Sequence, residues 1–83
     1  MDYAFFTFRS VTRGQLALRY LQAADVHAAL LRAPKALSAE GCGYAIRVRT
    51  ADAARAAQIF EHNAVPYQRR FHQSGGHYRE VGR

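Results

Sequence analysis

Residues 3–24 have the sequence YAFFTFRSVTRGQLALRYLQAA, which predicts a strand, a tight turn and a helix. Residues 3–8 are mostly aromatic, and aromatic side chains favour strands. Thr12 and Gln15 have the spacing of a capping box, so we expect the helix to begin at Thr12 and to end at Asp25. The residues that recur on one face of this helix, and so should lie against a core, are Leu16, Ala17, Tyr20, Leu21 and Ala24.

Two further strands and a loop are predicted after this helix. Residues 27–32 form a short apolar run of strand length, although its alanines also fit a helix. Residues 33–43 combine a proline with two glycines, a composition typical of an irregular loop. Residues 44–49 alternate strictly, so we expect Ile46 and Val48 on one face of a strand and Arg47 and Arg49 on the other.

The last part of the chain predicts a helix, an edge strand and a tail. Thr50 is a good N-cap, and the apolar spacing that follows predicts a helix to about Asn63. Residues 65–71 begin with a proline, which cannot donate a ladder hydrogen bond, so an edge strand is expected. Residues 72–83 are interpreted as a flexible C-terminal tail beyond a single domain of residues 1–71.

The order β-α-β-β-α-β with short connections predicts an α+β fold. Its expected form is a ferredoxin-like two-layer sandwich, a four-stranded antiparallel sheet with two helices on one face. In this topology the loop that contains Cys42 lies at the same edge of the sheet as the start of the first helix. The sequence does not predict the order of the strands.

Composition limits the functions that this chain can have. It has 83 residues, of which 49% are hydrophobic, with no apolar run long enough to span a membrane. The start Met1-Asp2-Tyr3 lacks the basic region of a signal peptide, so a cytoplasmic protein is expected. The single cysteine, Cys42, excludes an internal disulfide or a CxxC pair.

Charge indicates an anionic partner without identifying it. Twelve Lys and Arg residues oppose six Asp and Glu, and eleven of the twelve are arginine, which suits forked contacts with phosphate or carboxylate. The four histidines, His27, His62, His72 and His77, lack the spacing of a zinc site. There is no catalytic triad, carboxylate pair or phosphate loop, so independent enzymatic turnover is not expected.

Cys42 is the candidate reactive residue. A helix N-terminus stabilises anions, so a thiolate held beside the first helix would have a lowered pKa, with Arg9, Arg13 and Lys35 adding positive charge. Gly41 and Gly43 would leave the thiol uncrowded. The alternative is that Cys42 is a small buried hydrophobe at the head of the third strand, as many free cysteines are.

Two motifs resemble the selenium/sulfur (Se/S) carrier protein-like family. They are Phe8-x-Ser10-x-Thr12 and the stretch Pro34-Lys35-x-x-Ser38 that leads to Cys42-Gly43-x-Ala45-Ile46-Arg47, and the likeness extends over residues 3–71. The resemblance implies that Cys42 carries sulfur or selenium. It also implies that the residues of these motifs shape the carrier site: Ser10, Thr12, Pro34, Ser38 and Gly43. Lys35 stands where the family usually has arginine. Lysine keeps the positive charge but cannot make the bidentate hydrogen bonds of a guanidinium group.

Two hypotheses for function follow. In the first, the Cys42 thiolate takes a terminal sulfur or selenium atom from a donor such as a cysteine desulfurase, holds it as a persulfide or perselenide, and passes it to an acceptor enzyme. This hypothesis requires no metal or organic cofactor. In the second, Arg47, Arg49 and aromatic residues of the first strand form an open sheet face for homodimerisation or, less favoured, for RNA.

Overall fold

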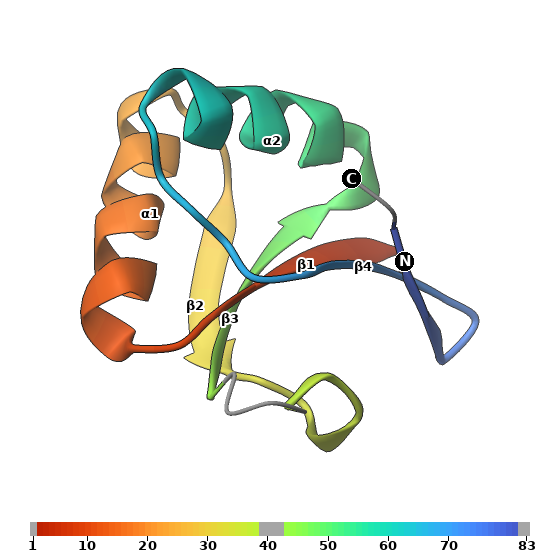
Figure 1. The fold of residues 1–83 in the computed structure, drawn as a ribbon. Coiled ribbons are helices and arrows are strands. Elements are labelled where there is room, and N and C mark those ends of the chain that lie inside the picture. Colours follow the sequence, from red (N-terminus) through yellow and green to blue (C-terminus); the bar gives the residue numbers. More distant parts are fainter. Residues whose placement is uncertain (1, 39–42, 82–83) are drawn as a thin grey trace.

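The computed structural model of this protein describes residues 2–38 and 43–81. Within these ranges the larger elements are five strands and two α-helices, together with the two short 3-10 helices η1 and η3 (Figure 1). In chain order they are β1 (Tyr3–Phe8), α1 (Val11–Ala23), β2 (Ala28–Arg32), η1 (Lys35–Leu37), β3 (Tyr44–Arg49), η3 (Thr50–Asp52), α2 (Ala53–His62), β4 (Arg70–Ser74) and β5 (His77–Glu80).

The strands form one antiparallel sheet in the order β2-β3-β1-β4-β5. The N-terminal strand β1 therefore lies in the middle, between β3 and β4. The α+β class, the two helices and the antiparallel sheet are confirmed. The expectation of four strands is wrong, because a fifth strand, β5, follows β4.

A two-glycine turn explains the fifth strand. Gly75 and Gly76 have φ angles of +56° and +82°, and positive φ at both central residues is the pattern of the tight hairpin turn that favours glycine. The chain therefore turns back after Ser74, and β5 pairs with β4 from His77 onward. Residues 72–81, interpreted from the sequence as part of a tail, thus form most of a β-hairpin.

The first face of the sheet is covered by both helices (Figure 1). Phe6 from β1 and Phe60 from α2 are fully buried there, with ring centroids 5.1 Å apart in an edge-to-face contact. Ile46 and Val48 lie on this face as predicted. Leu16, which was expected in the core, is 46% exposed, and Gly14 instead faces the sheet, where α1 approaches Leu30 closely.

The second face has a small core of its own. Phe5 and Phe71 are buried beneath Leu37 of η1, which is itself 2% exposed. The ring of Tyr78 from β5 meets Phe5 edge-on, with centroids 5.5 Å apart. The prediction of an open aromatic sheet face is therefore wrong at Phe5, because Leu37 of η1 and Tyr78 of β5 pack on it.

The helix starts differ from the predicted ones. Ser10, not Thr12, is the N-cap of α1: its backbone is extended, and its Oγ accepts a hydrogen bond from Arg13 N at 3.2 Å. Thr12 lies exposed in the first turn. Thr50 belongs to η3, and α2 begins at Ala53. The last predicted strand, residues 65–71, begins only at Arg70.

We expect Ser10→Ala to lower the free energy of unfolding by about 1 kcal/mol, because the first turn of α1 loses its side-chain acceptor. Thr12→Ala is the matched control and should change stability by a few tenths of a kcal/mol at most. Urea denaturation of both variants measures this difference. An equal loss in both variants would mean that the cap is not at Ser10.

The hairpin makes a second stability prediction. Tyr78→Ala should cost about 1–2 kcal/mol, because it removes the ring that packs on Phe5. His77→Ala, at an exposed position of the same strand, should have almost no effect. If thermal denaturation shows that the two variants are equally stable, then β5 does not contribute to the core.

Candidate functional site

Several of the predicted site residues, among them Arg9, Ser10, Arg13 and Gly43, lie at the end of the sheet where β1 leads into α1. Tyr44 at the start of β3 pairs with Phe8 on one side and with Arg32 on the other. Gly43 O accepts a hydrogen bond from Ala33 N at 3.0 Å, which closes the base of the β2–β3 connection. This connection therefore leaves the sheet at the end where α1 begins. Gly41 and Cys42 lie outside the described residues.

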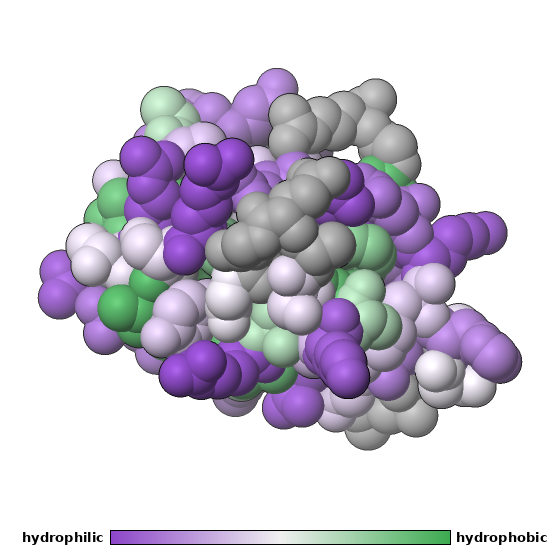
Figure 2. Space-filling model, turned by 60° about the horizontal axis from the view of Figure 1, so that its bottom comes forward, coloured by the Kyte–Doolittle hydropathy of each residue, from purple (hydrophilic) through white to green (hydrophobic). Residues whose placement is uncertain are grey.

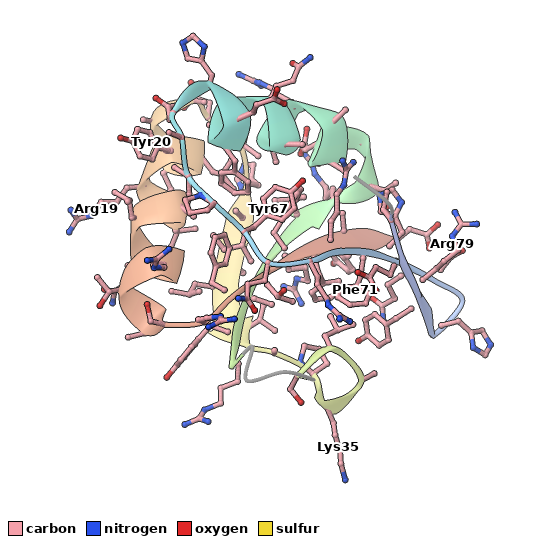
Figure 3. All side chains as sticks on the ribbon, viewed as in Figure 1. Arg19, Tyr20, Lys35, Tyr67, Phe71 and Arg79 are labelled. Atoms are coloured by element: carbon pink, nitrogen blue, oxygen red, sulfur yellow. The ribbon has the colours of Figure 1, made fainter. Side chains whose placement is uncertain are left out.

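Residues 34–38 form a short turn at the beginning of this connection. Pro34 precedes η1, and the Ser38 hydroxyl donates to Lys35 O at 3.0 Å, so the Ser38 side chain serves the turn itself. Lys35 is exposed and projects away from the body of the molecule (Figure 3). The structure thus separates Lys35 from the arginines that flank the α1 N-terminus.

A groove of about 470 Å³ lies at the start of α1. We call it the arginine groove, because three arginines line it: Arg9, Arg13 and Arg69. Its other lining residues are Phe8, Ser10, Pro66, Tyr67 and Gln68. Figure 2 turns this end of the molecule toward the viewer and shows many hydrophilic side chains on it. Three predicted site residues, Arg9, Ser10 and Arg13, therefore share one cavity.

Hydrogen bonds and an ion pair position the side chains of the arginine groove. When the Gln68 side-chain amide is oriented with its oxygen toward Arg9, this oxygen accepts hydrogen bonds from Nε and Nη2 of Arg9. Arg69 Nη1 lies 3.5 Å from Glu80 Oε1 of β5. The backbone on this side is fixed to β1, since Gln68 N donates to Thr7 O at 2.8 Å and Thr7 N donates to Arg69 O at 2.9 Å.

Sequence reasoning missed Gln68 and Arg69. The sequence predicts an edge strand over residues 65–71 and indicates no part in a site for Gln68 or Arg69. Their place depends on the pairing of β1 with β4, where Phe6 is opposite Arg70. A local pattern does not encode that register, because the two segments are far apart in the chain.

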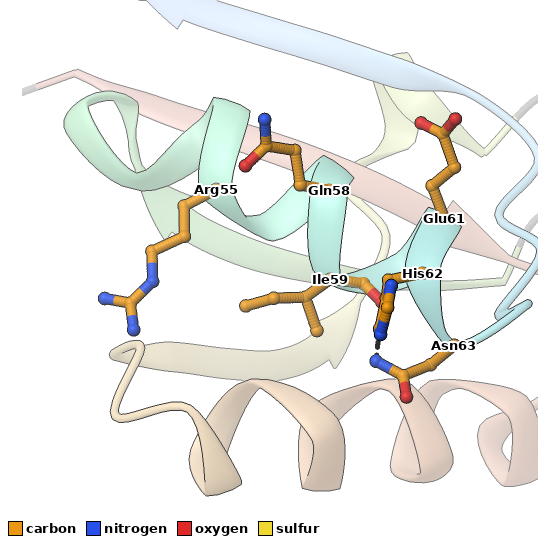
Figure 4. Close-up of a pocket in the computed structure, with 6 residues that line it drawn as sticks. All are labelled: Arg55, Gln58, Ile59, Glu61, His62 and Asn63. Carbon is orange, nitrogen blue, oxygen red and sulfur yellow. Dashed lines mark hydrogen bonds between the residues drawn. The ribbon is translucent and has the colours of Figure 1, made fainter.

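A second groove, of about 680 Å³, lies along α2 and is lined by residues of α2 and its C-cap (Figure 4). Arg55 Nη2 donates to Ala24 O at 2.7 Å and so ties α2 to the end of α1. Asn63 Nδ2 donates to Ile59 O at 2.8 Å and closes the last turn of α2. These polar groups stabilise the helix ends, and none of the lining residues is a nucleophile.

The remaining chemistry of the described residues is limited. Residues 2–38 and 43–81 contain no group of three or more His, Cys, Asp or Glu side chains that could hold a metal ion. No helix within these ranges is long and apolar enough to cross a membrane.

The arrangement defines a small basic α+β protein with one cysteine and an arginine-lined end. Residues 3–71 match the family model described as "Putative Se/S carrier protein-like", so the chain belongs to this family. No curated protein and no solved structure matches the chain.

The titration of His72 gives a pH prediction. Burial and the nearby charges of Arg70 and Arg79 lower the pKa of His72 below its usual 6.5. The unfolded chain therefore binds this proton more readily, so the stability that neutral His72 contributes is present above pH about 6.5 and is lost as the pH falls through the folded pKa. His72→Gln should lose less stability between pH 7.5 and 5 than the unmodified protein in urea titrations. His62→Gln, at an exposed position, should lose as much stability over this pH range as the unmodified protein. If His72→Gln also loses as much, then His72 is not the group responsible.

Proposed function

We propose that this protein carries sulfur or selenium on Cys42 and relays it from a donor protein to an acceptor enzyme. The observation that carries the proposal is that the family match over residues 3–71 includes the one cysteine of the chain. A carrier needs a single thiol that accepts and returns an atom, and it needs no other catalytic group.

The transfer step is a thiol–persulfide exchange. The Cys42 thiolate attacks the outer sulfur of a donor persulfide, such as that of a cysteine desulfurase. A bond forms between Cys42 Sγ and this outer sulfur, and the bond between the outer sulfur and the donor sulfur breaks. The donor leaves as a thiolate, and Cys42 becomes a persulfide. An acceptor enzyme receives the outer atom by the same exchange, so the relay needs no external oxidant or reductant.

The electrostatics at this end of the sheet support the proposal. Gly43 adjoins Cys42 in the chain and lies next to Tyr44, which pairs with Phe8 two residues before the Ser10 cap. Arg9 and Arg13 lie at the start of the same helix. Positive charge near a thiol favours the thiolate, which is the attacking form. Ser10, Thr12 and the first amides of α1 complete the proposed anion-stabilising set.

We further infer that the first four strands and the two helices form a ferredoxin-like sandwich. The strand order β2-β3-β1-β4 and the common helix-covered face support this. The carrier role suits the reducing cytoplasm, where thiols persist. A basic surface with twice as many cations as carboxylates suits an acidic donor or acceptor.

Mass spectrometry of the intact protein tests the proposal. After incubation with a cysteine desulfurase and cysteine, we expect the protein to gain one sulfur atom that a thiol reductant removes. Parallel incubation with selenide and a mild two-electron oxidant tests the heavier atom, because selenide must be oxidised before it can become the outer atom of a perselenide. Cys42→Ser should gain neither, because the accepting thiol is absent. A gain in Cys42→Ser, or no gain in the unmodified protein with either source, would contradict the carrier role.

A further inference from the structure

The arginine groove has the features of a binding site that does not depend on Cys42. Two segments from opposite ends of the chain build it: Arg9 and Arg13 come from the start of α1, and Arg69 precedes β4. A volume of about 470 Å³ lies in the range of pockets that bind small molecules. A concave cavity of this size accommodates a compact ligand better than the flat surface of a protein partner.

The positive charge of the arginine groove favours an anionic ligand. No carboxylate of the described residues lies within ion-pair distance of Arg9 or Arg13. Glu80 contacts Arg69 from the β5 side, and its contact distance of 3.5 Å is that of a loose, exposed pair. Guanidinium groups make forked hydrogen bonds to phosphate and carboxylate, and a dianion gains more from several converging cations than a single carboxylate does.

Neighbouring residues hold some of the hydrogen-bonding groups of the arginine groove in place. In the amide orientation that pairs with Arg9, the Gln68 side-chain oxygen accepts from the Arg9 guanidinium group and restricts it. The backbone of Gln68 and Arg69 is fixed to the central strand, since Gln68 N donates to Thr7 O and Arg69 N donates to Thr7 Oγ1. A ligand that bridges Arg9 and the Arg69 side would therefore meet groups that are partly held in place, which lowers the entropic cost of binding.

The arginine groove also has an apolar wall. Pro66 and Tyr67 line it beside the arginines, and the Tyr67 ring packs inward against Phe6 and Phe60. Figure 3 shows Tyr67 on the segment that crosses between α2 and the sheet. An apolar wall next to cations fits a ligand that joins an anionic group to an organic group. Free phosphate would use the cations alone.

From these observations we propose that the arginine groove binds the phosphate group of a small phosphate-bearing molecule. Free phosphate and a phosphate monoester share the recognised chemistry, and the apolar wall predicts a preference for the monoester. This inference does not require the proposed carrier role, because the described residues alone build the groove, but the two proposals share Arg9, Ser10 and Arg13.

NMR titration of the full chain tests this proposal. Sodium phosphate, added at constant ionic strength against sodium chloride, should shift the backbone amides of Ser10 and Arg69. Phenyl phosphate should bind more tightly than inorganic phosphate, and Pro66→Ala should reduce that preference. No phosphate-specific shift at these amides would overturn the proposal.

Charge variants provide the matched controls. Arg9→Gln and Arg13→Gln should each weaken phosphate binding about fivefold, the loss of one charged contact at a partly exposed site. Arg19→Gln removes an exposed arginine of α1 outside the groove and should leave the affinity unchanged. Glu80→Gln removes the carboxylate beside Arg69 and should tighten binding. Equal weakening by Arg19→Gln would indicate diffuse charge attraction and would overturn the proposal.

Two further experiments distinguish phosphate binding from the docking of acidic proteins and from the carrier role. A poly-glutamate peptide that displaces phosphate at equal charge concentration would identify the arginine groove as a docking surface for acidic proteins, and the phosphate assignment would be wrong. Cys42→Ser should still bind phosphate, at least as tightly as the unmodified protein does, because the substitution removes the proposed thiolate near Arg9 and Arg13. Its failure to accept sulfur would then be a separate result, so the carrier role and the phosphate site can fail independently.

Discussion

The edge-to-face contact between Phe6 and Phe60 joins the middle strand of the sheet to α2, and much of the structure depends on it. Phe60 also meets Phe8 and Tyr67 with ring centroids 6.0 Å apart, so one aromatic side chain links β1, α2 and the segment before β4. Tyr67 directly precedes Gln68 and Arg69 in the chain. The packing of this aromatic cluster therefore also positions the segment that contributes Gln68 and Arg69 to the arginine groove. Burial of these rings supplies both the stability of the core and the shape of the site.

Local sequence patterns predicted the elements that depend on their own residues. The alternation in residues 44–49 correctly placed Ile46 and Val48 toward the helices, since the pleat of a strand enforces a period of two. The helix start was misplaced because Ser10 and Thr12 are both good caps, and the spacing of Gln15 favoured the wrong one. The structure selects Ser10, whose extended backbone lets it continue directly from β1.

The missed hairpin and the missed half of the arginine groove have different causes. Gly75-Gly76 is a hairpin signal in the sequence, but the polar residues around it indicated a tail, and only the contact of Tyr78 with Phe5 gives β5 an apolar anchor. Arg9, Ser10 and Arg13 could be grouped because they are neighbours in the chain. Arg69 lies beside these residues because β1 pairs with β4. Lys35 lies apart from them because it projects outward from η1 (Figure 3). Both placements depend on the tertiary structure, which a local pattern does not encode.

The central position of the N-terminal strand has a consequence for how the chain folds. β1 acquires its two neighbours from residues 44–49 and 70–74, so its pairings require the closure of long loops, which slows folding compared with a bundle of local contacts. During synthesis the aromatic segment YAFFTF emerges long before β4 exists to cover its second edge. Until β4 is synthesised, this aromatic segment has an unpaired edge, and unpaired edges of apolar strands favour aggregation.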